Sequence, residues 1–254
     1  MVEKRIGRAP RQDAETGVLI RLALLAALAL PLAARAALPD EIQVYTDDLE
    51  RPGERGIELH VNWTPEGRRT PDYPGEVVTH RGLRVTPEIS WGLAENWDGG
   101  VYLPFVHSGD GAYFFAGPRL RLKWLPLRPG EAGTGMFAGI NGEASFVQER
   151  FEQSRRPAEI RPILGYRGEK WLFSFNPIFD TDLAGEKKGE FTFAPAFKVS
   201  RRAWPGMALG TEYYKDEQSR IVYLTADTER VNFGIGYGLT DASDRWTVKA
   251  IISF

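Results

Sequence analysis

From residue 56 onward, apolar and polar residues alternate in short segments that are separated by Gly, Pro, Asp and Asn. A period of two is typical of a strand whose two faces lie in different surroundings. Segments of this kind at regular spacing predict an all-β protein, either a sandwich or a barrel. About twelve strands are expected, over 56–63, 83–93, 97–106, 112–125, 136–148, 159–166, 171–179, 191–199, 207–214, 220–227, 231–239 and 245–254.

The segment 119–124 shows the two faces most clearly, because three apolar residues alternate with Arg119, Arg121 and Lys123. Two architectures fit this pattern: a soluble barrel or sandwich with the apolar face inward, and a membrane barrel with the apolar face toward lipid. A Lys or Arg that faces lipid costs about 2–4 kcal/mol at the bilayer midplane. In a membrane barrel these three cations must therefore face the lumen.

Linker lengths and tryptophan positions favour the membrane barrel. Outer-membrane barrels have long loops outside the cell, short periplasmic turns and aromatic residues at both interfaces. The seven tryptophans fall near expected strand ends, although ordinary core aromatics would also account for them. Linkers tend to be longer at 64–82, 107–111, 149–158, 180–190, 215–219 and 240–244, tight at 94–96, 167–170 and 228–230, and intermediate at 126–135 and 200–206. The expected fold is an up-and-down antiparallel transmembrane barrel of 10–12 strands.

The N-terminus has the features of a secretory signal peptide. A basic stretch ends at Arg21, an apolar run covers 22–34, and Ala34-Arg35-Ala36 forms an A-x-A cleavage site. The apolar run is shorter than the ~20 residues that a membrane-spanning helix needs. We expect a cleaved signal peptide over 1–36, a periplasmic segment over 37–55 that plugs or caps the barrel mouth through Val44 and Tyr45, and a barrel over 56–254.

Composition excludes several function classes. Without residues 1–36 the chain holds 26 basic and 31 acidic residues, which gives a formal charge of −5 and no basic stripe for nucleic acid. The chain contains no cysteine, so a disulfide framework and thiolate metal sites are excluded. We expect no metal and no cofactor.

The chain ends on a strand with an apolar terminal residue. One face carries Trp246, Val248, Ala250, Ile252 and Phe254, and the other carries Thr247, Lys249 and Ser253, with Ile251 as the one lapse. A final strand with a terminal Phe resembles the signal by which the barrel assembly machinery recognises outer-membrane barrels. The expected partners are that machinery and outer-membrane lipid.

Five stretches carry a resemblance to a known family: DEIQVYTDDLERPGERGIELHVN (40–62), YPGE (73–76), GLRVTPEISWGL (82–93), WDGGVYLPF (97–105) and NFGIGYGLTDASDRWTVKAIISF (232–254). The chain is similar over most of 40–254 to the proteobacterial barrels named after the MetA pathway of phenol degradation, which are described as transporters or channels. The resemblance implies a location in the Gram-negative outer membrane and transport of small hydrophobic compounds. It brings no catalytic residues.

The inward strand positions carry charged and amide side chains. They give two alternatives: a charged constriction that selects solutes, or a salt-bridged network that satisfies buried charge. The expected lumen-lining residues are Glu58, His60, Arg84, Glu88, Arg119, Arg121, Lys123, Asn141, Glu143, Arg161, Lys198 and Glu212.

Six prolines lie within the expected strands, in their outer halves. Proline lacks the ladder donor and belongs at edges, strand starts or bulges. The hypothesis is a weakened wall between the second and eighth strands through which an apolar solute leaves sideways. The alternative is that these strands project beyond the membrane, where water satisfies the freed carbonyls. The prolines are Pro87, Pro104, Pro118, Pro162, Pro177 and Pro195.

An enzyme is the third functional class, because a lipid-modifying barrel would need Ser and His on one face. Among the three histidines only His107 is followed by a serine, Ser108, and adjacent strand residues point to opposite faces. No catalytic residue is assigned. The leading function is therefore a channel or transporter for small hydrophobic molecules, and the alternative is a closed structural barrel without transport.

Overall fold

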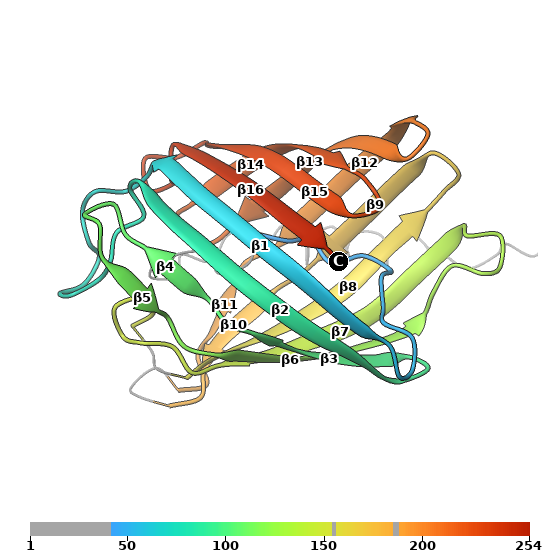
Figure 1. The fold of residues 1–254 in the computed structure, drawn as a ribbon, viewed down its shortest axis with the longest axis horizontal. Coiled ribbons are helices and arrows are strands. Elements are labelled where there is room, and N and C mark those ends of the chain that lie inside the picture. The colour runs from blue at the N-terminus through green and yellow to red at the C-terminus, as the bar shows by residue number, and fades with distance from the viewer. Residues whose placement is uncertain (1–41, 154–155, 185–187) are drawn as a thin grey trace, which may run out of the picture. The chain divides into compact units, whose positions relative to one another are not determined.

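The computed structural model describes residues 42–153, 156–184 and 188–254, which form one closed antiparallel barrel (Figure 1). The expected signal peptide lies outside the described residues. No helix among the described residues is long and apolar enough to cross a membrane. The strands are β1 (Arg55–Glu66), β2 (Gly82–Ala94), β3 (Trp97–Tyr102), β4 (Phe105–His107), β5 (Tyr113–Phe115), β6 (Arg119–Leu127), β7 (Gly135–Ser145), β8 (Pro157–Arg167), β9 (Trp171–Asn176), β10 (Phe179–Asp182), β11 (Phe191–Phe193), β12 (Ala196–Trp204), β13 (Met207–Lys215), β14 (Arg220–Asp227), β15 (Val231–Gly238) and β16 (Trp246–Ser253).

These segments make twelve wall strands, because four of the strands are each interrupted once. The two segments of each interrupted strand pair with the same neighbouring wall strands. These strands are β3 with β4, β5 with β6, β9 with β10, and β11 with β12. Every strand pairs with the next along the chain, and β1 pairs with both β2 and β16, which closes the barrel. The prediction of an all-β, up-and-down barrel of about twelve strands is confirmed.

Apolar residues cover the outside of the wall. On β6, Leu120, Leu122 and Trp124 are exposed on the barrel exterior, while the alternate residues Arg121 and Lys123 are buried inside. A soluble barrel would have the opposite arrangement. The exterior is therefore suited to hydrocarbon, which is the condition for a transmembrane barrel.

The two ends of the barrel differ in their connections (Figure 1). At one end, called here the short-turn end, the connections are 95–96, 128–134, 168–170, 205–206 and 228–230, and the chain's C-terminus lies there too. At the other, the long-loop end, they are 67–81, 108–112, 146–156, 183–190, 216–219 and 239–245. This asymmetry follows the predicted alternation of linker lengths.

The last strand places its terminal aromatic residue on the outer face of the barrel. Trp246 and Phe254 are exposed on the barrel exterior, whereas Thr247 and Lys249 are buried inside. Ile251, the lapse in the sequence pattern, is an apolar residue on the inner face. The Phe254 amide donates to the carbonyl of Ile57 at 3.0 Å, so the ladder continues to the terminal residue.

A charge on the outer face should destabilise the barrel in a depth-dependent way. Leu224 lies in the middle of β14 and is 70% exposed on the exterior. We expect Leu224→Lys to reduce the free energy of unfolding in lipid vesicles by about 2–4 kcal/mol. The control is Leu239→Lys at the long-loop end, where we expect about 0–1 kcal/mol. Equal effects at both sites would contradict a bilayer around the strand middles.

Candidate functional site

The twelve side chains assigned to the lumen from the sequence all lie on the inner side of the wall. Ten of them are buried, and Glu58 and Arg119 are half-buried. Ten of the twelve form two groups of contacting side chains, and the other two are Arg84 and Arg161.

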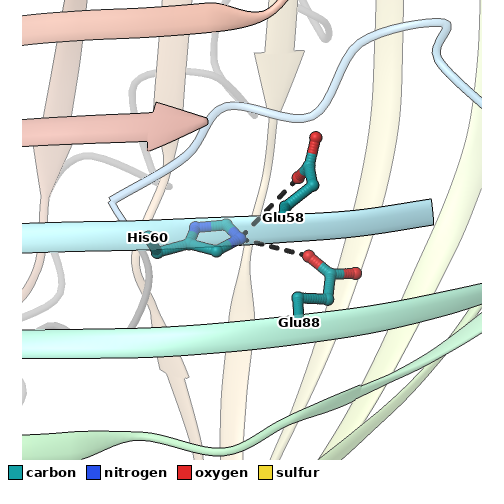
Figure 2. A group of neighbouring side chains, drawn as sticks. All are labelled: Glu58, His60 and Glu88. Carbon is teal, nitrogen blue, oxygen red and sulfur yellow. Dashed lines mark hydrogen bonds and ion pairs between the residues drawn. The ribbon is translucent and has the colours of Figure 1, made fainter. Parts of the chain in front are cut away.

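The first group begins on the neighbouring strands β1 and β2 (Figure 2). His60 Nε2 lies 3.1 Å from an oxygen of Glu88 and 3.7 Å from an oxygen of Glu58. The other oxygen of Glu88 accepts a hydrogen bond of 2.6 Å from Nε of Arg121 on β6. These three ligand-type atoms of Glu58, His60 and Glu88 lie within 4.8 Å of one another.

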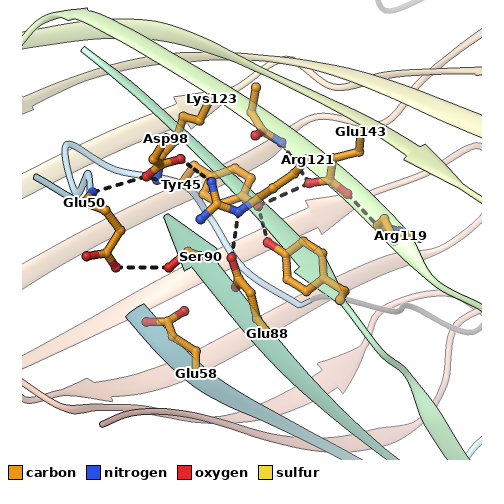
Figure 3. Close-up of polar contacts among 12 residues, drawn as sticks. Tyr45, Glu50, Glu58, Glu88, Ser90, Asp98, Arg119, Arg121, Lys123 and Glu143 are labelled. Carbon is orange, nitrogen blue, oxygen red and sulfur yellow. Dashed lines mark hydrogen bonds and ion pairs between the residues drawn. The ribbon is translucent and has the colours of Figure 1, made fainter. Parts of the chain in front are cut away.

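The group continues through β3, β6 and β7 as a chain of alternating charges (Figure 3). Arg121 also donates to Asp98, and the other oxygen of Asp98 lies 3.3 Å from Lys123 Nζ. Further along, Arg119 pairs with Glu143 at 3.1 Å. Buried charges are costly unless they are paired, and this arrangement pairs each of these cations with a carboxylate.

The second group is centred on Glu212 of β13. One carboxylate oxygen accepts a hydrogen bond of 3.0 Å from Lys198, and the other accepts from Lys249 and, at 2.6 Å, from the hydroxyl of Tyr214. Lys198 also donates to Asp227 at 2.9 Å. The positive charges of Lys198 and Lys249 therefore balance the negative charges of Glu212 and Asp227 inside the wall.

The remaining two arginines lie apart from these groups. Arg161 makes a two-pronged ion pair with Glu159, at 2.6 and 3.0 Å. The Arg84 guanidinium is buried and lies 5.9 Å from the centroid of the Phe151 ring. Neither of them belongs to the first or second group.

Sequence reasoning missed several members of these groups. Asp98 and Lys249 are buried and bind opposite charges, yet they were not assigned to the lumen. The same period-two rule that selected Arg121 would have found both, since Asp98 lies between two outward positions and Lys249 shares a face with Thr247. The period-two rule does not show which residue each of them binds. Lys249, for example, binds Glu212 on β13, which is not a neighbouring strand of β16.

Residues 42–50 of the N-terminal segment lie in the lumen, and residues 51–54 are exposed at the short-turn end. Val44 and Tyr45 are buried, and the Tyr45 carbonyl accepts a hydrogen bond of 2.6 Å from Ser174. The Tyr45 hydroxyl lies 2.8 Å from that of Tyr102 and donates to Glu143 at 3.1 Å. The Tyr45 side chain therefore contacts β3 and β7, and its backbone carbonyl binds β9.

Backbone carbonyls of the same segment complete the coordination of two buried cations. Lys249 Nζ donates to the carbonyl of Ile42 at 2.8 Å, and Arg161 donates to that of Gln43 at 3.0 Å. The Tyr45 ring lies 4.6 Å from the Arg161 guanidinium carbon and 5.4 Å from Lys123 Nζ, within the range of cation–π attraction. The wall thus holds the segment both by these polar contacts and by the apolar clusters around Val44 and Tyr45.

At the long-loop end, loop 67–81 joins two other loops. The Val77 amide donates to the carbonyl of Arg150 at 2.8 Å. On the other side, Thr79 and the Arg68 amide both donate to Asp244, the latter at 2.9 Å. Burial raises the pKa of Asp244, although both hydrogen bonds oppose that shift. The loops are therefore connected to one another across this end.

A cavity of about 970 Å³ reaches into the lumen from the short-turn end. Turn residues such as Lys170, Gly206 and Arg230 surround its mouth, and Glu58 and Glu88 of the first group line its interior. Val44 to Glu50 of the N-terminal segment form part of its wall. The cavity is the space through which a solute would approach both charged groups.

Four of the six prolines lie at the strand interruptions. Pro104, Pro118, Pro177 and Pro195 each fall in the gap between two aligned segments, whereas Pro87 and Pro162 lie within the continuous strands β2 and β8. The interruptions have a local cause, because proline cannot donate to the ladder. The sequence predicted a single strand at each of these four places, and the structure has that strand with one interruption.

The wall continues past most of these prolines. Leu103 donates to the carbonyl of Pro87, Ala116 to that of Pro104 and Phe146 to that of Pro118, at 2.8–3.0 Å. The exception is the boundary between β8 and β9–β10. There the register is the same on both sides and places Pro162 opposite Pro177, so neither of these two residues can donate a ladder hydrogen bond to the other. We call this stretch the proline seam.

The residues considered for an enzyme do not form a catalytic pair. Ser108 donates to Asp110 and to the carbonyl of Ala112, and the His107 ring stacks on Tyr113 with centroids 4.3 Å apart. Each of the two side chains thus has a partner other than its neighbour. The geometry that a Ser-His hydrolase needs is not present at this place.

Comparison with solved structures identifies the fold. The chain is similar to an outer membrane channel from Pseudomonas putida F1, with a TM-score of 0.52, 13% identity, and coverage of 84% of this chain and 100% of that one. It is also similar to the KdgM porin solved with disordered oligogalacturonate, with a TM-score of 0.44 and 9% identity over 79% of this chain and 99% of that one. No protein-family model and no curated protein matches the chain. At this identity the first similarity shows an outer-membrane type of barrel and no more.

A substitution of Lys249 tests the second charged group. Lys249 is fully buried, and its ammonium binds Glu212 and the Ile42 carbonyl. We expect Lys249→Met to reduce the free energy of unfolding by about 3 kcal/mol, because it leaves buried acceptors unpaired. The double variant Lys249→Met with Glu212→Gln should recover part of that loss. Denaturant titration in detergent measures both, and additive losses would contradict direct coupling.

Proposed function

We propose that this protein is an outer-membrane channel or transporter whose passage is restricted by its own N-terminal segment. The observation that carries the proposal is the position of residues 42–50 inside the barrel, held by Ser174, Arg161 and Lys249 next to a cavity of about 970 Å³. A closed structural barrel needs neither a cavity nor a removable segment.

The proposed orientation places the short-turn end in the periplasm and the long-loop end outside the cell. Outer-membrane barrels have this distribution of connections. The N-terminal segment would then enter from the periplasm, which is the side from which an exported chain arrives. Lipid and the barrel assembly machinery are the proposed partners, with the Trp246–Phe254 face of the last strand as the recognition signal.

The proposed solute is small and predominantly apolar. Inside the wall, Leu125, Phe137 and Ile163 form an apolar cluster with Tyr45. Toward the long-loop end, a second cluster contains Val106, Ala116 and Phe151. These side chains are buried in this structure, so an apolar solute would contact them only after the interior rearranges, whereas the paired charges offer no net charge to attract an ion. Membership of the phenol-degradation family is consistent with such a solute and is part of this proposal.

Two exits are available to such a solute in this proposal. One leads between the loops at the outer end, and the other leads sideways into the bilayer at the proline seam. The seam is the place where the wall is weakest, because backbone groups that lack ladder partners are costly in lipid. Sideways release would suit an apolar molecule, since it goes directly into hydrocarbon.

Weakening the hold on the N-terminal segment should increase ion flow. Tyr45→Ala removes the hydroxyl contacts to Tyr102 and Glu143 and the ring between two cations. We expect a severalfold higher single-channel conductance in planar bilayers. The control is Tyr166→Ala, since Tyr166 is exposed on the outer face of β8. An intact barrel that passes no ions in either form would refute the channel and favour a closed structural barrel.

Restoring ladder donors at the seam should reduce the escape of apolar solutes. We expect Pro162→Ala with Pro177→Ala to slow the uptake of a small aromatic compound severalfold and to leave ion conductance unchanged. The vesicles need lipopolysaccharide in the outer leaflet, because plain phospholipid is itself permeable to apolar molecules. Pro205→Ala in a short turn is the matched control. Unchanged uptake in the double variant would eliminate the sideways route.

A further inference from the structure

Three side chains of the first charged group are arranged as metal ligands. Glu58 and His60 are two residues apart on β1, so both point inward, and Glu88 is the direct cross-strand partner of Glu58 on β2 (Figure 2). In zinc sites the bonds to His nitrogen and carboxylate oxygen are about 2.0–2.2 Å long. Two ligands at that distance from one ion lie roughly 3–3.6 Å apart in tetrahedral or octahedral geometry.

The two separations from His60 are close to this requirement, and all three atoms lie within 4.8 Å of one another. His60 Nε2 lies 3.1 Å from Glu88 Oε2 and 3.7 Å from Glu58 Oε2. An ion could be placed between these atoms with only side-chain adjustment, because the backbone already sets the positions. Ligand sets of one imidazole and two carboxylates favour borderline transition metals over calcium or magnesium.

Each carboxylate is oriented by a second contact. The oxygen of Glu88 that turns away from His60 accepts from Arg121 at 2.6 Å. The corresponding oxygen of Glu58 accepts from the Ser253 hydroxyl at 2.6 Å. Outer contacts of this kind fix the direction of metal ligands, and here they leave one oxygen of each carboxylate facing the imidazole.

Electrostatics supply an independent reason for a cation at this point. Like charges directly opposite each other on neighbouring strands are destabilising, and Glu58 faces Glu88 in the register.

The position is accessible from one side of the barrel. Glu58, Glu88 and Ser253 line the cavity that opens at the short-turn end, and His60 is buried directly behind them. A hydrated ion could enter there, bind the two carboxylates first and then reach the imidazole. The long-loop end need not open for this to occur.

We propose that Glu58, His60 and Glu88 form a binding site for one divalent transition-metal ion of the zinc class inside the barrel. The alternative occupant is a proton on His60, which would make the same contacts to both carboxylates. The two occupants differ in one measurable respect, because only the metal site binds a stoichiometric ion.

The test uses the full mature barrel, purified in detergent without a histidine tag and stripped with a chelator. Isothermal titration with Zn²⁺ and the visible absorption of Co²⁺ should both show one equivalent bound. We expect His60→Gln to abolish this binding and Glu58→Gln to weaken it at least about tenfold. His107→Gln is the matched control, since that imidazole stacks on Tyr113 outside the group, and it should bind like the unmodified protein.

Folding of each variant is checked by its mobility in unheated gels, and Glu58→Gln alone decides the question if His60→Gln does not fold. The absence of stoichiometric binding to the unmodified barrel would overturn the proposal. Binding that survives His60→Gln, or that survives Glu58→Gln undiminished, would overturn it as well. No transport is measured, so the result is independent of the proposed channel function.

Discussion

The bilayer is the constraint on which the rest of this structure depends. Each wall strand has one face in hydrocarbon, where a charge is costly, so the ionisable side chains of the strand middles are turned inward. Inside, they are enclosed by a low-dielectric wall and must be paired. The two charged groups around Arg121 and Glu212 are therefore a consequence of the outer surface, as well as candidates for a functional site.

The N-terminal segment fits this constraint because it brings backbone acceptors into a charged interior. Carbonyls of Ile42 and Gln43 bind a lysine and an arginine of the wall, and the Tyr45 hydroxyl binds a carboxylate. A segment held by polar contacts can be released into water at modest cost, since water replaces each contact. The apolar packing of Val44 and Tyr45 against the wall adds to this hold.

The parts of the structure that could be predicted from the sequence are those set by local chemistry. A period of two decides which side chain faces lipid, so Arg121 and Leu122 were assigned to opposite faces correctly. The strand breaks at Pro104 and Pro177 follow from the missing donor, but the sequence could not show how far each break extends. Pairing partners depend on register and on strand tilt around a closed wall. The contact between Lys249 and Glu212 joins β16 to β13 and has no local signal, and the insertion of Tyr45 depends on the whole barrel.

The pairing of inward charges bears on what could pass. A constriction selects ions when its charges are unpaired and present a net field, as in rings of one sign. Here Arg119, Arg121, Lys123 and Lys198 each lie next to a carboxylate, so their fields largely cancel at the distance of a passing molecule. The network alternative thus gains support over the charged filter. A neutral molecule that moves past such ion pairs experiences little electric field. An ion would lose part of its hydration there, and the opposite charges that could compensate it are already paired.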